Sequence, residues 1–195
     1  MTNDNIKVWD VPLRLFHWLL VAGFVLTYVA AELHLAFWHV GLGYALIVLL
    51  LFRLLWGFVG NPYARFSSFL FSAAETLAYV RSLRTAHPVH YYGHNPAGAL
   101  MVFALLGLLA AIFASGLLTL AAIDFEGPLA FLANRVDDDT AYFLRHAHDW
   151  LVDAALLLIP LHLLGVLLGS VQHKENLVRA MVTGMKKVVD KNTGA

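Results

Sequence analysis

The stretch His148-Asp-Trp-Leu-Val-Asp-Ala-Ala-Leu-Leu-Leu-Ile-Pro-Leu-His162 places two histidines in a largely apolar run. Fourteen residues make four helical turns less about 40°, so both rings leave one face of a helix, about 21 Å apart. His146 lies roughly 160° away from His162 and does not share that face. The separation covers most of the ~30 Å hydrocarbon core of a bilayer. Because ionisable groups inside membranes are rare and usually functional, we interpret both rings as ligands rather than incidental core residues.

Composition favours a membrane protein. The chain of 195 residues is 60% hydrophobic and 13% charged, whereas soluble domains are about 45–50% apolar and about 25% charged. It contains no cysteine, which excludes disulfides, iron–sulfur clusters and covalently attached haem. Any redox centre must therefore be a non-covalent cofactor. The formal net charge is zero, so the overall charge indicates no nucleic-acid partner.

The hydrophobic pattern predicts an all-α fold, an integral membrane four-helix bundle that forms a single domain over residues 1–195. Four apolar spans, two connections and a tail follow one another, and we place the spans at 12–31, 39–59, 97–122 and 143–171, the connections at 60–96 and 123–142, and the tail at 172–195. Ser72-Ala-Ala-Glu75 has the spacing of a capping box and predicts a short interfacial helix at about 72–84.

The first span has two possible interpretations, a signal peptide and a retained transmembrane helix. Its apolar core is longer than the ~7–15 residues of such a peptide, and Asp4 and Asp10 precede it. We therefore expect a retained transmembrane helix, and we expect residues 1–10 before it to be frayed.

Lys and Arg predict the orientation. Eleven of the thirteen fall on one side when both termini and the 60–96 connection share that side. The positive-inside rule then places both termini in the cytoplasm. With this orientation the histidines sort into two levels. His17 and His162 lie near the inner leaflet, and His39 and His148 lie near the outer leaflet.

Each level pairs histidines from two different helices. Bundle cores hold haem iron between imidazoles on facing helices, so the pattern predicts two non-covalent haem b groups. His17 and His162 would bind the inner haem, and His39 and His148 the outer haem. Two haems, one per leaflet, would form an electron path across the membrane.

Small residues follow two of the histidines. Gly41 and Gly43 come two and four residues after His39, and Gly165 comes three after His162. A flat macrocycle needs small neighbours, and close helix packing needs them equally. Both interpretations stay open.

Three further polar residues are candidates for the cofactor. Arg53 follows His39 by the same fourteen residues, at the level of the inner haem. A charge deep in a helix costs ~2.5–3.5 kcal/mol, so a haem propionate is its natural partner, with snorkelling to headgroups as the alternative. Arg14 has the same two interpretations. His94 directly precedes the third span and would bond an inner propionate or a quinone.

The other polar residues carry weaker predictions. We expect His34 in the outer turn and His173 in the basic tail to be solvated. His87 and His90 form a minor metal-pair alternative. Asp153 lies in the fourth span without an assigned role.

Four pieces of the chain together resemble the bacterial cytochrome b561 superfamily, which includes the b-type subunits of membrane nickel–iron hydrogenases. The pieces are Trp9-Asp-Val-Pro-Leu-Arg-Leu-Phe-His17-Trp18, His39-x-Gly41-x-Gly43 with Arg53, Gly93-His94-Asn95-Pro96, and the His148/His162 pair. The resemblance covers about residues 7–187. It implies a four-helix dihaem bundle that exchanges electrons between quinone and a partner, with His17, His39, His148 and His162 as iron ligands.

We therefore expect a dihaem cytochrome b of the bacterial inner membrane, working in a respiratory chain. It would link quinone or quinol to a periplasmic redox protein such as a c-type cytochrome. The acidic outer connection with Asp137, Asp138 and Asp139 suits a basic docking face. A homodimer rests on general frequency alone.

Three alternatives stay open. The first is the membrane-anchoring cytochrome b subunit of a hydrogenase. The second is quinone-linked superoxide oxidation, against which the acidic outer connection argues. The third is a haem-free proton-coupled transporter, which needs a polar path that the third span lacks.

Overall fold

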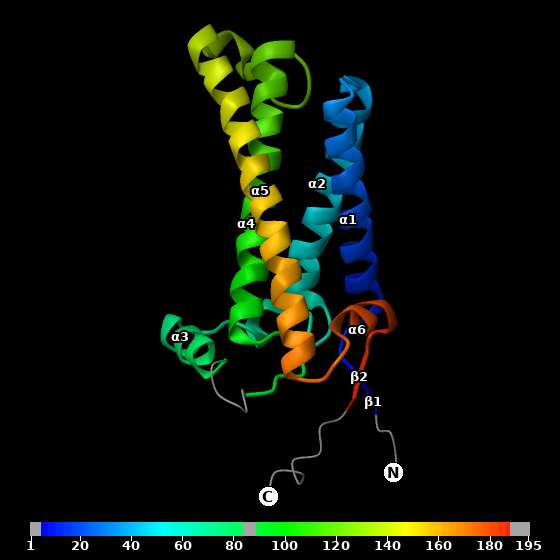
Figure 1. Ribbon diagram of the computed structural model, residues 1–195. Helices are drawn as coiled ribbons and strands as arrows, with labels where there is room; N and C mark the ends of the chain where they lie inside the picture. Colours follow the sequence, from blue (N-terminus) through cyan, green and yellow to red (C-terminus); the bar gives the residue numbers. More distant parts are fainter. Residues whose placement is uncertain (1–4, 84–88, 188–195) are drawn as a thin grey trace, which may run out of the picture. The chain divides into compact units, whose positions relative to one another are not determined.

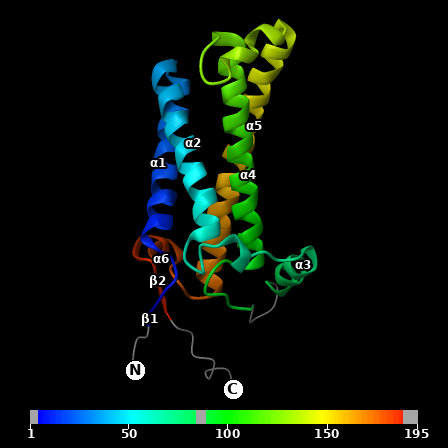
Figure 2. The same ribbon diagram turned by 180° about the vertical axis from the view of Figure 1, so that it is seen from behind.

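The computed structural model describes residues 5–83 and 89–187 and is mainly helical (Figures 1 and 2). Among these residues, four helices are long and apolar enough to cross a membrane. They are α1 (Val11–Glu32), α2 (Ala36–Val59), α4 (Pro96–Thr119, continued by the π-helical η2, Leu120–Asp124) and α5 (Asp138–Gln172). The predicted all-α class with four apolar helices is confirmed.

Shorter elements connect and follow these helices. They are β1 (Asn5–Lys7), η1 (Phe66–Ser68), α3 (Ala73–Ser82), η3 (Ala130–Arg135), α6 (Leu177–Thr183) and β2 (Met185–Lys187). The chain divides into two compact units. The first unit is Met1–Met101 with Leu163–Ala195, and the second unit is Val102–His162.

In the first unit, α1 and α2 pack closely against each other. A Cβ on Gly23 of α1 would lie 2.6 Å from Leu46 Cδ2 of α2, so glycine permits the approach. Asp10 fixes the start of α1, because one carboxylate oxygen accepts from the amide of Leu13 at 2.9 Å. The other oxygen accepts from Trp56 Nε1 of α2 at 3.0 Å. One carboxylate thus caps α1 and joins it to α2.

The two ends of the described chain pair with each other in the first unit. β1 and β2 form an antiparallel ladder with Ile6 opposite Lys186, and the amide of Val8 donates to the Gly184 carbonyl at 2.8 Å. Val8 is fully buried and Trp9 is 7% exposed. The expectation that residues 1–10 are frayed is therefore wrong for residues 5–10, and residues 1–4 lie outside the described residues. Apolar Val8 and Trp9 pack where the tail folds back as α6 and β2.

The connection after α2 contains the predicted capping box. Ser72 Oγ accepts from the amide of Glu75 at 3.2 Å, and Glu75 Oε2 accepts from the Ser72 amide at 2.7 Å. These bonds to Ser72 lower the pKa of Glu75 below its ordinary value. The spacing of Ser72 and Glu75 therefore predicted α3 correctly, because each side chain satisfies an amide at the helix end.

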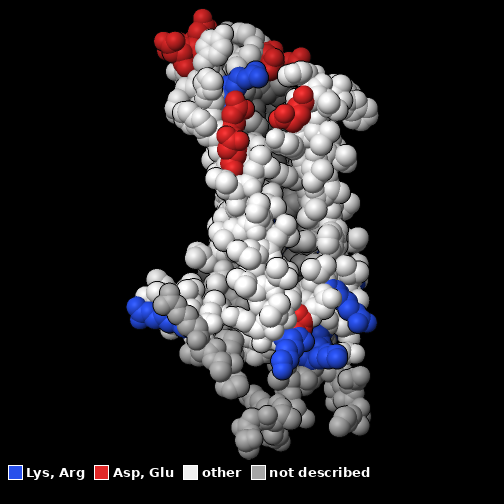
Figure 3. Space-filling view, in the orientation of Figure 1, with Lys and Arg blue, Asp and Glu red and all other residues white. Residues whose placement is uncertain are grey.

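In the second unit, α5 begins earlier than the sequence pattern suggested. Asp137 Oδ1 accepts from the amide of Thr140 at 2.8 Å, which caps the helix, so α5 starts at Asp138 rather than near residue 143. Hydrogen bonds from Thr140 lower the pKa of Asp137. Figure 3 shows acidic side chains gathered around the segment that joins α4 to α5. The acidic run therefore serves the helix end, where the dipole favours negative charge.

Candidate functional site

His39 of α2 is held by a backbone carbonyl of α1. Its Nδ1 lies 3.1 Å from the carbonyl oxygen of Thr27. A carbonyl can only accept, so Nδ1 carries the proton and donates. This tautomer places the imidazole lone pair on Nε2. Ligating histidines usually hold one ring nitrogen in this way and use the other for the metal.

His148 of α5 shows the same arrangement with α4. Its Nδ1 lies 3.0 Å from the Ile112 carbonyl and 3.1 Å from Ser115 Oγ. Ser115 is buried and donates its own hydroxyl proton to the Ile112 carbonyl at 2.9 Å. The Nδ1 proton is therefore shared between a carbonyl and a hydroxyl oxygen, and the lone pair again lies on Nε2.

Gly116 lets the ring of His148 approach α4. A Cβ at this position would lie 3.0 Å from Cε1 of His148 and 3.3 Å from its Nδ1. Any larger residue would force the ring to move. The sequence analysis missed Ser115 and Gly116, although the run Ala114-Ser115-Gly116 of three consecutive small residues was a signal for a close contact.

Arg53 of α2 is 2% exposed. Its guanidinium carbon lies 4.7 Å from the ring centroid of Phe66. Within the described part of the chain, Nη1 has no hydrogen-bond partner. A buried guanidinium nitrogen without an acceptor is costly, which suits an anionic group of a cofactor better than snorkelling.

Arg14 and His94 have surroundings that the sequence did not reveal. Arg14 Nη1 donates to the carbonyl of Val182 in the last turn of α6, which joins α1 to α6. The ring of His94 packs between Trp9 and Phe69, with centroid distances of 4.8 and 4.5 Å. The family-like motifs at Trp9 and His94 therefore meet in the first unit. The cofactor roles of both residues stay predictions.

The remaining candidates are placed as follows. A Cβ built on Gly41, Gly43 or Gly165 would meet no described atom within 4 Å, so the surface beside each is open. His17 is half-buried with its ring edge-on to Trp18 at 5.1 Å, and His162 is half-buried. The pairing of His17 with His162, and of His39 with His148, stays a prediction.

Other histidines lie apart from these candidates. His34 and His146 are exposed, and the His146 ring stacks on Trp150. The expectation that His173 is solvated is wrong, because it is half-buried with its ring 5.2 Å from that of His90. Burial, then the charge of His90, lowers the pKa of His173. Asp153 is exposed on α5.

The minor metal-pair interpretation gains no support. His87 lies outside the described residues, and His90 Nε2 pairs with Glu175 at 2.9 Å. No group of three or more His, Asp or Glu lies close enough to hold a metal ion among residues 5–83 and 89–187. Haem iron is held by one or two axial side chains, so this result does not bear on the haem prediction.

The four apolar spans assign the chain to the all-α membrane proteins. Residues 8–184 match the prokaryotic cytochrome b561 family, and the chain belongs to it. A curated relative, the probable Ni/Fe-hydrogenase B-type cytochrome subunit of Azotobacter vinelandii, is 31% identical over 127 residues, covering 50% of this chain. The chain spans about half of that relative (52%). The comparison with solved structures found no match.

Membership makes the chain a membrane b-type cytochrome and implies haem b. The residues present fit such a group in three respects. His39 and His148 carry their proton on Nδ1, Arg53 has a buried nitrogen without an acceptor, and Gly41 and Gly43 leave an open surface. Each of these features is of a kind that haem b needs, namely an imidazole ligand for iron, a cation for a propionate and open space beside a helix.

Proposed function

We propose that the chain transfers electrons across the bacterial inner membrane with two haem b groups, between quinone or quinol and a periplasmic redox protein such as a c-type cytochrome. His17 and His162 hold the inner haem, and His39 and His148 hold the outer haem. Both termini lie in the cytoplasm. The distribution of Lys and Arg along the chain supports this orientation.

One observation carries the proposal. His39 and His148 each donate Nδ1–H to a carbonyl on the neighbouring helix of their own unit. Any buried histidine needs an acceptor for its ring proton, and a ligating histidine uses the same bond to direct its second nitrogen toward the metal. The bond fixes the tautomer and the ring direction and raises the basicity of the second nitrogen.

Haem b, when bound, takes up and releases single electrons at its iron. His17, His39, His148 and His162 would supply nitrogen ligands to the iron, and the identity of the axial ligands is one of the features that set the potential. Arg53 contributes a buried positive charge that stabilises the added electron. The apolar side chains of the four spans exclude water and thereby set the potential.

Reduced-minus-oxidised spectra with a pyridine haemochrome count test the proposal. We expect two haem b per chain with low-spin bands. Each of His17→Ala, His39→Ala, His148→Ala and His162→Ala should lose one haem. His146→Ala is the matched control, because His146 is an exposed histidine on the same helix as His148. A count of zero in folded, haem-supplied wild type would contradict the proposal, and a count of one would contradict the pairing.

A second candidate is the membrane-anchoring cytochrome subunit of a hydrogenase. The similarity to the probable Ni/Fe-hydrogenase B-type cytochrome subunit of Azotobacter vinelandii supports it. The two candidates share the haems and differ in the electron donor. Stopped-flow mixing of the reduced protein with a c-type cytochrome, and of the oxidised protein with a hydrogenase iron–sulfur subunit under hydrogen, distinguishes them. Rapid transfer in only one mixture selects that partner.

A further inference from the structure

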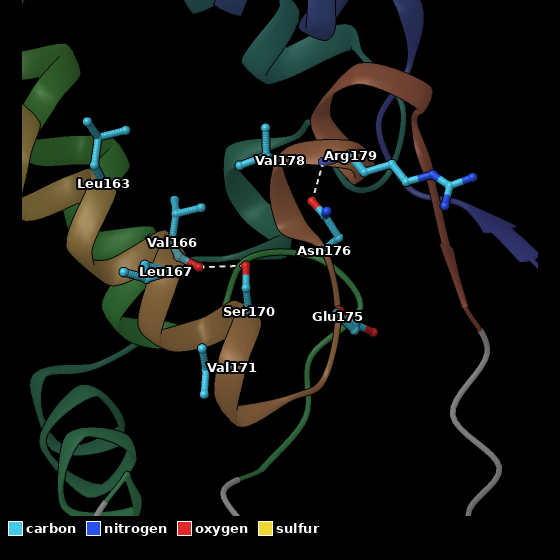
Figure 4. A pocket seen from close by; sticks show the side chains of 9 residues that line it. All are labelled: Leu163, Val166, Leu167, Ser170, Val171, Glu175, Asn176, Val178 and Arg179. Atoms are coloured by element: carbon cyan, nitrogen blue, oxygen red, sulfur yellow. Dashed lines mark hydrogen bonds between the residues drawn. The ribbon is translucent and has the colours of Figure 1, made fainter.

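The last turns of α5 and the short helix α6 border an open apolar groove of about 650 Å³ in the first unit. Figure 4 shows Leu163, Val166, Leu167 and Val171 of α5 along one wall, with Val178 of α6 across from them. These α5 residues belong to an apolar membrane span. Leu163 to Val171 covers about 12 Å of helix axis, most of the ~15 Å depth of one leaflet.

The groove continues into a basic pocket of about 580 Å³. Glu175, Asn176 and Arg179 line both. The pocket adds three lysines from the α5–α6 turn and β2, namely Lys174, Lys186 and Lys187. Figure 3 shows basic side chains gathered over the α5–α6 turn, α6 and β2.

The acidic residue in the pocket is neutralised by its neighbours. Glu175 Oε2 lies 3.2 Å from Lys186 Nζ, and Glu175 Oε1 lies 2.9 Å from His90 Nε2. Both Glu175 and Lys186 are nearly buried. The exposed cations that remain are Lys174, Arg179 and Lys187. An incoming anion therefore meets a positive surface.

We propose that this joined groove and pocket is a binding site for an anionic phospholipid. The phosphate lies among Lys174, Arg179 and Lys187, and an acyl chain runs along Leu167 and Val171. Two features support a lipid over a free anion or an uncharged ring compound. The groove follows the span for most of the depth of a leaflet, and basic residues next to a span attract anionic headgroups.

Native mass spectrometry of the detergent-purified protein tests the charge requirement. The probes are phosphatidylglycerol and phosphatidylcholine with identical acyl chains. We expect phosphatidylglycerol to bind at least tenfold more tightly. Arg179→Gln and Lys174→Gln should each weaken it about fivefold, which is about 1 kcal/mol. Arg81→Gln, an exposed cation of α3 outside the site, is the control and should change nothing.

The groove is tested separately from the charges. Val178→Gln should weaken phosphatidylglycerol binding, whereas Val182→Gln should not. Val182 is equally exposed on the same helix and lines neither cavity. Both variants should keep the wild-type haem spectrum, which shows that they fold.

Wild-type protein alone also decides the question. Equal affinity for the two lipids would overturn the proposal. So would binding of phosphatidylglycerol that inorganic phosphate at matched concentration displaces completely, because the acyl chain would then contribute nothing. The expected result is that phosphate does not displace phosphatidylglycerol, whereas 0.5 M salt, where the Debye length is about 4 Å, releases it.

Discussion

The helix pairs α1/α2 and α4/α5 each hold a histidine by Nδ1, but they differ in what surrounds the ring. His39 donates to the Thr27 carbonyl. His148 shares its proton between the Ile112 carbonyl and Ser115 Oγ, and Gly116 makes room for it. A backbone acceptor survives side-chain substitution, whereas a hydroxyl and a glycine do not. The α4/α5 pair should therefore be the more sensitive to mutation around its histidine.

The largest effect is expected at Gly116. Gly116→Val places side-chain atoms where the His148 ring lies, because even a Cβ would be 3.0 Å from Cε1. The ring must turn and break its bond to Ile112. We expect loss of one of the two proposed haems in the pyridine haemochrome count.

Gly107→Val is the control for that change. It lies on α4 as well, and a Cβ there meets no described atom within 4 Å. Full haem content with an unshifted spectrum in Gly116→Val would break the comparison, because the close approach would then serve helix packing alone.

Arg53 is the residue to mutate in the α1/α2 pair. The acceptor of the His39 proton in this pair is a backbone carbonyl, which a substitution does not remove. Arg53→Gln removes a buried positive charge, which should disfavour the reduced state. We expect the midpoint potential of one haem to fall on the order of 50 mV, since ~40 mV corresponds to 1 kcal/mol for one electron. Potentiometric titration measures this.

Two variants make the Arg53 result specific. Arg53→Lys should keep most of the potential, because it keeps the charge. Arg81→Gln removes an exposed charge and should have no effect. An unchanged potential in Arg53→Gln would assign the guanidinium to packing on Phe66, from which it lies 4.7 Å.

A substitution at Ser115 should change the midpoint potential by less than the Arg53→Gln substitution does. Ser115→Ala removes one of the two acceptors of the His148 proton, which lowers the basicity of the ligand and disfavours the oxidised state. The Ile112 carbonyl remains, so we expect full haem content and a potential about 20 mV higher, half of a 1 kcal/mol effect.

Ser170→Ala is the matched control for Ser115→Ala. Its hydroxyl bonds a carbonyl of its own helix, that of Val166 at 2.7 Å, and contacts no histidine ligand candidate. A fall in potential in Ser115→Ala, instead of a rise, would mean that the hydroxyl does not accept the Nδ1 proton.

The smallest expected effect is a pH dependence of folding stability that arises from His173 in the first unit. Burial and then the charge of His90 lower the pKa of His173, and Lys186 acts in the same direction while Glu175 opposes them. The unfolded chain therefore takes up the proton first as pH falls below about 6.5. Stability should be lost from that pH downward until the folded protein is also protonated.

Thermal unfolding of wild type and His173→Gln measures this. The wild-type midpoint should fall more between pH 7.5 and 5.5 than that of the variant. His34→Gln, at an exposed histidine, should follow wild type. A variant with the wild-type pH dependence would show that His173 does not carry the effect.

The sequence predicted the fold class because its strongest signals are local. Apolar runs longer than a bilayer crossing and the Ser72/Glu75 spacing need no knowledge of distant contacts, and α3 and the four long helices follow from them. The spacing of His148 and His162 is equally local. The choice of His148 and His162 as candidate ligands therefore rested on arithmetic along one helix, whereas His17 and His39 were added from the predicted orientation of the spans.

Contacts between distant segments were not predictable in the same way. The return of the tail onto residues 5–9 depends on a ladder of three residue pairs and on Val8, which no periodicity marks. The Nδ1 acceptors of His39 and His148 are backbone carbonyls, and every residue has one. For the same reason His173 was expected in solvent, because its burial depends on His90 more than eighty residues away.

The pairing of β1 with β2 has a consequence for biosynthesis. Residues 5–7 leave the ribosome about 180 residues before their partners at 185–187. At about 5–20 residues per second, roughly 10–40 seconds pass with Val8 and Trp9 uncovered. The last residues to be synthesised therefore cover the first ones. A chain truncated before Met185 would contain the four long apolar helices but would lack the β1–β2 pairing.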